Sequence, residues 1–524
     1  MQFIHYGHAC LKLEGRSDAA CIMDPWLSRD GAFFRSWFQF PENHPFQDDA
    51  VRGVVDICLS HNHEDHFDLG VITKILEEHP EAKLHIARFP SSWFVRHARR
   101  RLGALADRVV EHDPFAFFPL RAGGEICFVP EESPGQVDAA MVWRDGDRNL
   151  LNLNDARLNT DQFLRIKEIL GHVDAFCLQG SGASEYPVCY DYDPGDLLRR
   201  RMEKRTLKLE ACERVIDLMN PNRVLIFAGP PVFLDPGLNA MNDASATSVF
   251  PDQLDITRHF ASRRPDIAER CWFTMPGDRL DDDHLFSRTD LTDPRFQAYT
   301  DKASYIEGYR ERRMDLLPYD WGDLPPMGET LAHFRRMATV SPWASEKIGG
   351  SVDFVIHGKR DKATYSVDFA RGLAAEGPSA NPLYVLEAPA ASVHEVLEGR
   401  ATWDDVMLSL RMVFRERTPR FVPHLKTLLK YQDAETLERL AEYEEKLQRR
   451  AATEETIRVE SHGKCFRIAR HCPHAGVDLL RHGEVNDDGT ITCMAHRFRF
   501  DLSSGECLNA KGFRLEVRRE APSE

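Results

Sequence analysis

The stretch LSHNHEDHFD, residues 59–68, constrains this chain more than any other part of its sequence. It places three histidines and an aspartate within six positions, directly after the apolar run VVDICLS. Such a run predicts a buried strand, and a tight loop at its end would point alternate side chains into one cleft. Imidazole and carboxylate groups are metal ligands. The stretch therefore predicts a metal site held by His61, His63, Asp65 and His66.

The composition of the 524 residues argues against several classes of protein. The formal net charge of −16 is unlike that of a nucleic-acid binder, which carries a basic surface, although it would attract a cationic small molecule. No run reaches the roughly 18 apolar residues that a membrane span needs. The start MQFIHYGHACLKLEG has no apolar signal core. Twelve scattered cysteines favour reduced thiols and a cytoplasmic location.

Changes of pattern along the chain predict five segments. Residues 1–251 alternate strands with helices, which predicts one large two-sheet α/β domain with helical layers. Residues 252–330 are polar and predict a helical connector, and residues 331–432 predict a compact α+β module. Residues 433–456 are almost wholly polar and predict a linker helix. Residues 457–524 predict a small all-β domain.

A second set of metal ligands lies in the last segment. Cys472-Pro-His474 is followed by Cys493-Met-Ala-His496, a Cys-x-His pair and then a Cys-x-x-His pair. This is the ligand set of a Rieske [2Fe-2S] centre, in which two thiolates hold one iron and two imidazoles hold the other. The alternative is a structural zinc site with two cysteines and two histidines. Zinc sites more often open with Cys-x-x-Cys, so the mixed pairs favour the cluster.

The histidine loop resembles the His-x-His-x-Asp-His motif of the metallo-β-lactamase superfamily. The resemblance implies an αββα sandwich, with Asp155 of LNLND as the metal-bridging aspartate and Asp24 of IMDPW as a supporting carboxylate. The superfamily's third-motif histidine and its final histidine are both missing. After GEICFVP the chain has Glu131, Glu132 and Ser133, and after NRVLIFAG it has Gly229, Pro230 and Pro231.

These departures favour a carboxylate-rich centre over a standard dizinc hydrolase. Glu131 or Glu132 could serve as an oxygen ligand, and either could equally be a turn residue. His5 and His8 in FIHYGHACL are candidates to line the same cleft, although a lone histidine on a strand more often has a structural role. Histidine plus carboxylate ligands with open positions suit iron that activates dioxygen. Zinc is redox-silent, so a cluster that delivers electrons would have nothing to reduce there.

Several stretches together resemble CMP-N-acetylneuraminate hydroxylase and its bacterial relatives, which combine a metallo-β-lactamase-like domain with a Rieske domain. They are YGHACLKLE, DPWLS with GAFFRSWFQFP, LSHNHEDHFD, NLLNLNDARLN and LQGSGASEYPVCYDYD. The N-terminal part also resembles lactonases of the ascorbate-phosphate type. In the sialic-acid enzyme we expect the Rieske part first, whereas here it comes last. The 331–432 module, with VDFVIHG and WDDVMLSLRMVF, resembles a sterol-carrier-protein-like fold whose expected role is a lid or a dimer surface.

The resemblance implies a monooxygenase that hydroxylates a C–H bond with O2 at one or two non-haem iron ions. Its expected catalytic residues are Asp65, His66 and Asp155. The chain has no flavin or nicotinamide fingerprint, so NAD(P)H would act through an external ferredoxin or flavin reductase. In many Rieske oxygenases electrons cross between subunits, which makes a homo-oligomer one expected arrangement.

Two substrate classes compete. Putrescine or another polyamine would need carboxylates and aromatic rings around its ammonium groups, and the stretch 185–196 offers them. The candidate substrate residues are Glu185, Tyr190, Asp191 and Asp193. The alternative substrate, CMP-N-acetylneuraminate or a related amino sugar, is anionic and would need basic side chains or a phosphate loop. QGSGAS, at 179–184, is the one small-residue turn of that kind.

Two other functions remain open at this stage. One is a zinc or manganese hydrolase of the lactonase or phosphodiesterase type, which uses metal-bound hydroxide and carries the cluster as a redox sensor. The other is an electron carrier whose N-terminal domain has lost its metal. The intact HNHEDH motif argues against this second alternative.

Overall fold

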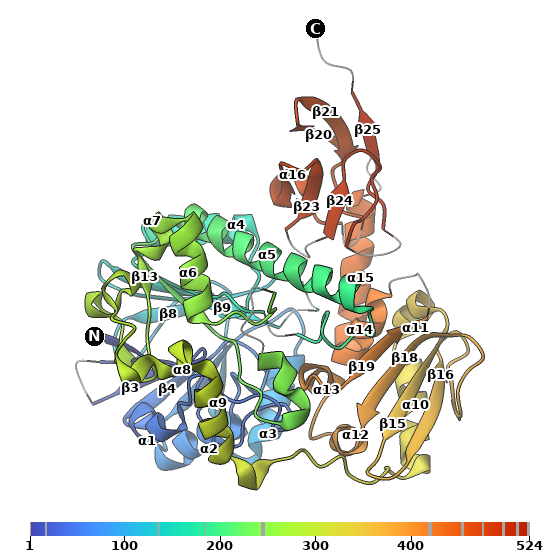
Figure 1. Ribbon diagram of the computed structural model, residues 1–524, viewed down its shortest axis with the longest axis horizontal. Helices are drawn as coiled ribbons and strands as arrows, with labels where there is room; N and C mark the ends of the chain where they lie inside the picture. The colour runs from blue at the N-terminus through green and yellow to red at the C-terminus, as the bar shows by residue number, and fades with distance from the viewer. Residues whose placement is uncertain are drawn as a thin grey trace.

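A computed structural model of the chain describes residues 2–15, 18–133, 135, 137–182, 184–242, 247–417, 422–451, 455–473, 476–494, 498–509 and 513–520. These residues form three units that Figure 1 shows in blue to green, yellow to orange, and red. Among the described residues, no helix combines the length and the apolar composition required to cross a lipid bilayer.

The N-terminal sandwich contains two sheets of seven strands. The first has the order β14-β1-β2-β3-β4-β5-β6. Its strands are β1 (Gln2–His5), β2 (Leu11–Glu14), β3 (Ala20–Met23), β4 (Val54–Leu59), β5 (Lys83–Ala87), β6 (Val109–His112) and β14 (Asp278–Arg279). Strands β3 to β6 are parallel, and the pairs from β14 to β3 are antiparallel.

The second sheet repeats this plan, with the order β13-β12-β11-β10-β9-β8-β7. Its strands are β7 (Phe118–Pro119), β8 (Glu125–Pro130), β9 (Ala139–Asp145), β10 (Arg148–Asn152), β11 (Ala175–Gln179), β12 (Arg223–Phe227) and β13 (Cys271–Trp272). Strands β10 to β13 are parallel. The carboxyl ends of its parallel strands, like those of the first sheet, carry the loops that build the site.

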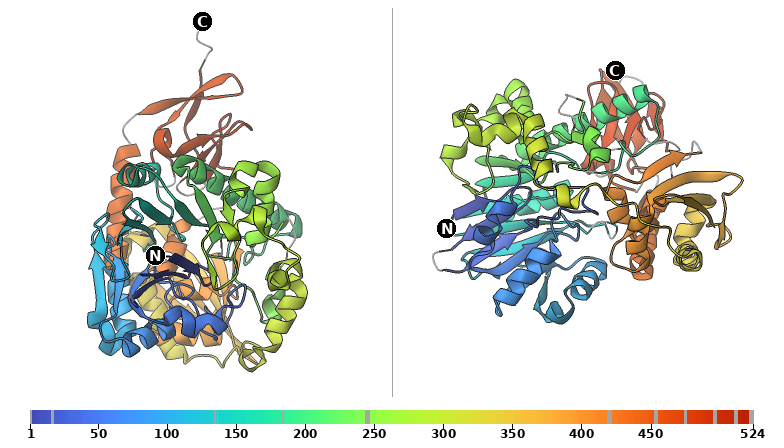
Figure 2. Two further views of the ribbon diagram at one scale, coloured as in Figure 1. Left: turned by 90° about the vertical axis from the view of Figure 1, so that its left-hand side faces the viewer. Right: turned by 60° about the horizontal axis from the view of Figure 1, so that its bottom comes forward.

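Helices cover the outer face of each sheet and complete four layers (Figures 1 and 2). On the side of the first sheet lie α1 (Gln47–Val51), α2 (Leu69–Glu78) and α3 (Trp93–Leu102), and on the side of the second lie α4 (Thr160–Leu170), α5 (Pro194–Met219), α6 (Gln253–Arg263) and α7 (Pro265–Ala268). The apolar spacing of α2 explains its position, because Val71, Ile72, Ile75 and Leu76 are all buried. The layers confirm the predicted α/β fold class with an αββα sandwich.

Residues 252–330 are more than the helical connector that the sequence predicts. They supply β13 to one sheet and β14 to the other, so they close an edge of each. Their helices include α8 (Gln297–Thr300) and α9 (Lys302–Glu311), which pack on the sandwich through a small apolar cluster with Phe38 and Tyr309. The strands are two residues long and polar in part, and for this reason no alternating pattern marks them in the sequence.

The central module, residues 327–430, is an α+β unit. Its sheet has the order β17-β16-β15-β18-β19, with β15 (Ser351–His357), β16 (Lys362–Asp368), β17 (Leu373–Glu376), β18 (Pro382–Pro389) and β19 (Val413–Glu416). Its helices are α10 (Met327–Thr339), α11 (Pro342–Ile348), α12 (Ala390–Leu397), α13 (Trp403–Leu408) and α14 (Pro423–Lys430). Its buried apolar residues form one continuous cluster with those of the first sheet, so the module is packed onto the sandwich.

Helix α15 (Ala434–Ala451) connects the central module to the C-terminal unit. The sequence predicts a helix that is polar on every side, but Leu437 is fully buried and Thr436 bonds Ser91 of the sandwich, with 2.6 Å between their hydroxyl oxygens. The helix therefore rests on the other two units. Beyond it stand two three-stranded sheets (Figure 1). They contain β20 (Thr456–Ser461), β21 (Lys464–Ala469) and β25 (Val517–Arg519), then β22 (Gly483–Val485), β23 (Thr490–Cys493) and β24 (Phe498–Asp501), with α16 (Leu479–His482) beside them.

A buried ion pair fixes the central module on the sandwich. Arg411 Nη2 lies 2.6 Å from Asp235 Oδ2, and the two side chains are 5% and 7% exposed. Close by, Phe414 of β19 donates its N–H to the carbonyl of Cys189 at 2.8 Å, and its own carbonyl accepts from Asp191 N at 3.0 Å. The module is therefore held by backbone pairing and by charges removed from water.

Arg411→Met should lower the free energy of unfolding by about 3 kcal/mol, because it leaves the Asp235 carboxylate buried without its cation. Arg415→Met is the matched control on the same module. Arg415 is one third exposed and pairs with Asp191, so its loss should cost about 1 kcal/mol or less. Thermal and denaturant unfolding measure both. Equal destabilisation by the two substitutions would contradict the importance of the buried pair.

Candidate metal and cluster sites

The histidine loop lies at the carboxyl end of β4, and Asp155 lies just beyond the carboxyl end of β10 in the facing sheet. Because the two sheets pack face to face with these edges on the same side, the loops meet in the interior. His61 and His66 are fully buried, Asp65 is 4% exposed, and Asp155 is half-buried. The fold thus brings together residues that are about 90 positions apart in the chain.

Two overlapping groups of donor atoms could each hold a metal ion. His8, Asp65 and His66 form one group, and His61, His66 and Asp155 form the other, with the donor atoms of each group within 4.8 Å of one another. His66 belongs to both, because its Nε2 lies 3.7 Å from Asp65 Oδ2 and 3.7 Å from Asp155 Oδ1. The sequence predicts His8 only as a residue that lines the cleft.

Several of these donor atoms have no hydrogen-bond partner among the described residues. They are His66 Nε2, Asp65 Oδ1, Asp155 Oδ1 and His8 Nδ1, all buried. A buried polar atom without a partner costs about 1–3 kcal/mol, and a bound cation removes that cost for a nitrogen or carboxylate ligand. The donor set therefore fits a metal ion, and its mixture of imidazole and carboxylate suits iron as well as zinc.

The side of each histidine that faces away from the donor cluster is held by a neighbour. Asp24 Oδ2 lies 3.2 Å from His66 Nδ1, while its Oδ1 accepts from Ser60 N at 2.8 Å. Ser60 Oγ lies 2.9 Å from His61 Nδ1. Partners of this kind fix the ring orientation and tautomer of a ligating histidine. Asp24 thus occupies the supporting position that the resemblance implies.

Opposite charges set the protonation of the cluster. Burial by itself would raise the pKa of Asp65, but His66 and His8 lower it to about 2. Burial would lower the pKa of His66, but Asp65 and Asp24 raise it to about 10. Burial and the neighbouring histidines hold the pKa of His61 well below its usual range. At pH 7 Asp65 is therefore ionised and His61 neutral, which are the forms that ligate a metal, whereas His66 is protonated and must give up its proton when a metal binds.

The backbone around the site is strained. His8 (φ 47°), Asp24 (φ 44°) and Asn154 (φ 49°) all adopt the left-handed conformation, which costs a residue with a Cβ on the order of 1 kcal/mol. Each lies at, or next to, a member of the donor cluster. Strain of this kind persists only where the surrounding structure fixes the conformation, and it is found most often at functional sites.

Glu131 is not brought into either donor group. It is buried, but its Oε1 accepts the backbone N–H of Arg157 at 2.5 Å. Burial and the nearby Asp138 raise its pKa to about 8. The sequence predicts Glu131 as a replacement for the third-motif histidine. In the structure its carboxyl group instead bonds the backbone of the loop after Asp155.

The four candidate substrate residues have different surroundings. Glu185 is buried and forms an ion pair with Lys426 of the central module. Tyr190 is buried too, and its ring stacks on Phe414 at 4.8 Å between centroids. Both line the cavity described below.

The other two carboxylates do not line that cavity. Asp191 pairs with Arg415 of the central module. Asp193 caps the start of α5, where its Oδ1 accepts from Gly195 N at 3.1 Å and from Asp196 N at 3.0 Å. Capping and interface formation account for both side chains.

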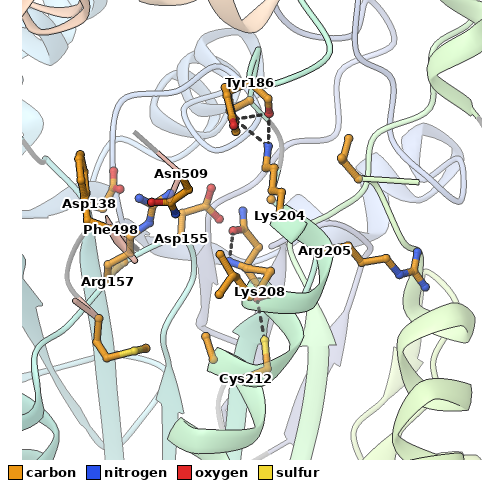
Figure 3. Close-up of a pocket in the computed structure, with 18 of the residues that line it drawn as sticks. Asp138, Asp155, Arg157, Tyr186, Lys204, Arg205, Lys208, Cys212, Phe498 and Asn509 are labelled. Carbon is orange, nitrogen blue, oxygen red and sulfur yellow. Dashed lines mark hydrogen bonds between the residues drawn. The ribbon is translucent and has the colours of Figure 1, made fainter. Parts of the chain in front are cut away.

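A cavity of about 1280 Å³ connects the donor cluster to the rest of the molecule. Its lining comes from all three units, as Figure 3 shows for Asp155 and Lys204 of the sandwich and Phe498 of the C-terminal unit. His63 and Asp65 lie at one end, and Asp404 and Lys430 of the central module also line it.

Two of the predicted cluster ligands lie in the described part of the C-terminal unit. Cys472 and Cys493 are fully buried within the apolar core of that unit. Met494, the residue after Cys493, lines the cavity and donates its N–H to the carbonyl of His482 at 2.8 Å. The other two predicted ligands, His474 and His496, lie outside the described residues.

Ion pairs join the C-terminal unit to the sandwich. Arg214 of α5 lies 2.7 Å from Glu484, and Arg481 lies 2.5 Å from Asp161 of α4. These contacts hold the described part of the C-terminal unit against α4 and α5.

Comparisons with known proteins identify one part of the chain. Residues 434–515 match the family described as Rieske [2Fe-2S] domain. A Mycolicibacterium smegmatis protein, provisionally named a Rieske 2Fe-2S iron-sulfur protein, is 29% identical over 547 residues, which covers 99% of this chain and 100% of that protein.

Two solved structures are each similar to part of the chain. The metallo-β-lactamase fold protein YhfI of Bacillus subtilis covers 43% of this chain and 85% of its own, at 14% identity and a TM-score of 0.27. Sterol carrier protein 2 of Yarrowia lipolytica covers 22% of this chain and 96% of its own, at 12% identity and a TM-score of 0.17. The chain thus carries a Rieske [2Fe-2S] domain, formed by β-strands, on an αββα sandwich with a potential metal centre.

His61→Gln should reduce the metal held by the sandwich and leave the two irons of the cluster in place, because only the donor cluster loses a ligand. Cys472→Ser should remove the irons of the cluster, together with its visible absorption, and should leave the metal of the sandwich in place. Metal analysis of the purified proteins measures both. His172→Gln, at an exposed histidine on the same domain, is the control. Identical metal content in His61→Gln and the unmodified chain would refute the assignment.

Proposed function

We propose that this protein is an oxygen-dependent hydroxylase whose Rieske cluster supplies electrons to a non-haem iron site in the sandwich. The observation that supports it best is the shared cavity. Met494, which follows the cluster ligand Cys493, and Phe498, two positions after His496, line the same space as Asp65 and Asp155. An electron donor and a metal site that face one cavity within one chain are arranged for transfer between them.

The proposal requires a metal that can change its oxidation state. Iron held by imidazole and carboxylate with open positions supplies dioxygen activation, whereas zinc has no redox chemistry to offer the cluster. In the overall reaction one atom of O2 enters a substrate C–H bond and the other leaves as water. Two electrons and two protons are consumed, and the electrons come from NAD(P)H through a separate ferredoxin or flavin reductase. The resemblance to CMP-N-acetylneuraminate hydroxylase supports the same reaction type.

The residues of this chain have defined tasks in such a reaction. His61, His66 and Asp155, with His8 and Asp65 beside them, would hold the metal, while Asp24 and Ser60 orient the histidines. The central module closes one side of the cavity with Asp404, Lys430 and Tyr431 and so limits the access of water.

The charges in the cavity favour an anionic substrate over a polyamine. The acidic side chains that would bind an amine are engaged elsewhere, with Glu185 paired to Lys426 and Asp191 to Arg415. Lys204, in contrast, places a basic side chain in the lining of the cavity. Its Nζ donates to Ser184 Oγ at 2.8 Å and to the Tyr186 carbonyl at 2.6 Å, and no described carboxylate forms an ion pair with it.

A second lysine extends this cationic surface. Lys208 lies one turn further along α5 and donates to Gln179 Oε1 at 2.7 Å, and Arg157 lies near Asp155 (Figure 3). Gln179 and Ser184 flank the small-residue turn after β11. The phosphate or carboxylate group of an amino sugar or of its nucleotide derivative would pair there with the Lys204 ammonium. Such a substrate would reach from the α5 lysines to the metal end of the cavity.

The binding of an anion should weaken as the pH rises. Burial lowers the pKa of Lys204 to about 7, so its ammonium is charged below that pH and neutral above it. Titration of the protein with inorganic phosphate or N-acetylneuraminate between pH 6 and 8.5 should show affinity falling above about pH 7. Lys204→Arg should flatten the profile, because a guanidinium stays charged throughout. An unchanged profile in that variant would remove Lys204 from the anion site.

Hydroxylation itself is tested with the iron-loaded, fully reduced protein. Mixing it with labelled dioxygen and a panel of anionic amino sugars and diamines should give a product heavier by one oxygen atom, with the label in that product. Cys472→Ser should give at most one turnover per iron centre without its cluster to re-reduce it. Turnover of a lactone or phosphodiester by the zinc-loaded protein, with no labelled product from the iron form, would favour the hydrolase alternative instead.

A further inference from the structure

The central module places a carboxylate against His63, the histidine of the predicted ligand set that belongs to neither donor group. Asp404, in the first turn of α13, has its Oδ2 3.2 Å from His63 Nε2. Both side chains are mostly buried, at 14% and 16% exposed. The two residues are 341 positions apart, and the contact joins two different units of the molecule.

The other nitrogen of His63 faces the donor cluster. His63 Nδ1 lies 2.9 Å from His61 Nε2, and the two rings are 4.5 Å apart. If Nε2 carries the proton and donates it to Asp404, Nδ1 keeps its lone pair on the side of His61. The imidazole then lies between a carboxylate and the metal donors. This arrangement fixes the tautomer of a ligating histidine and increases its basicity.

Asp404 is fixed in place from several directions. Thr402 caps α13, with Asp405 completing the capping box, so the turn that carries Asp404 is well defined. Lys430 Nζ lies 4.0 Å from Asp404 Oδ2 and favours its ionised form. The buried pair Arg411–Asp235 then holds the whole module against the sandwich.

We propose that the central module is part of the metal centre, with Asp404 as the positioning residue that holds His63 as a ligand. The sandwich by itself then provides an incomplete site, because the partner of His63 comes from another unit. The inference rests on the metal site of the proposed function. It gives the module a role in metal affinity in addition to its role in enclosing the cavity.

The test compares Asp404→Asn with Glu387→Gln in the full chain with its cluster intact. Each substitution removes one carboxylate charge from the central module, but Glu387 pairs with Arg415 and His357, away from the donor cluster. Titration calorimetry with Co²⁺ measures affinity, and the ligand-field spectrum of the bound Co²⁺ reports the ligand set. Asp404→Asn should weaken Co²⁺ binding by about 10- to 100-fold and change the spectrum, while Glu387→Gln should do neither. Asp404→Glu should retain more affinity than Asp404→Asn.

The outcomes separate this inference from the proposed function. Cluster absorption and melting temperature establish that each variant is folded, and both should match those of the unmodified chain. If Asp404→Asn binds Co²⁺ as tightly as Glu387→Gln, with the same spectrum, the role of Asp404 is wrong and the metal centre stands. If the unmodified chain binds no Co²⁺ at the sandwich, the metal centre and the role of Asp404 are both wrong.

Discussion

The structure depends on the convergence of largely buried polar side chains around His66. His66 Nε2, Asp65 Oδ1 and Asp155 Oδ1 are buried without hydrogen-bond partners among the described residues. Each such atom costs about 1–3 kcal/mol, and three neighbouring residues with left-handed backbones add to that cost. A protein that needed only stability would fill this space with apolar groups. The packing of the two seven-stranded sheets holds these polar atoms in place, and a bound metal ion would remove the free-energy cost of burying them.

The three units are attached in two different ways. The sandwich and the central module share one apolar cluster, a buried ion pair and paired backbone. The C-terminal unit has its own core and meets α5 and α4 through the ion pairs of Arg214 and Arg481. Exposed ion pairs contribute about 0–1 kcal/mol each. The metal site is therefore built into the firmly packed part, and the cluster domain is attached to it by weaker contacts.

Charge is distributed unevenly along the cavity. Asp65, Asp155 and Asp404 gather at the metal end, where a cation would balance them. Lys204 lies on α5, where an anionic group would balance its charge. A substrate that fills the cavity would thus direct its negative group away from the metal-site carboxylates. The net charge of −16, which favours cations in general, says little about this local surface.

The amino-acid sequence by itself determined the elements and motifs that depend on local pattern. The apolar run before His61 predicted β4, the spacing of 69–78 predicted α2, and the paired cysteines and histidines predicted the Rieske domain that the family comparison supports. These features arise from neighbouring residues, so periodicity and ligand spacing are enough to find them.

Only the tertiary structure decided which side chains meet. Nothing near His8 marks it as a partner of Asp65, 57 residues away, and nothing near Asp404 marks it as a partner of His63. Glu131 has the right chemistry and position in the sequence, yet its carboxylate bonds the backbone of Arg157. The acids of 185–193 likewise serve as a cap and as ion-pair partners. A side chain's local sequence gives its chemistry, but its partner depends on how distant segments pack, because burial forces each polar group to find whatever partner the fold places beside it.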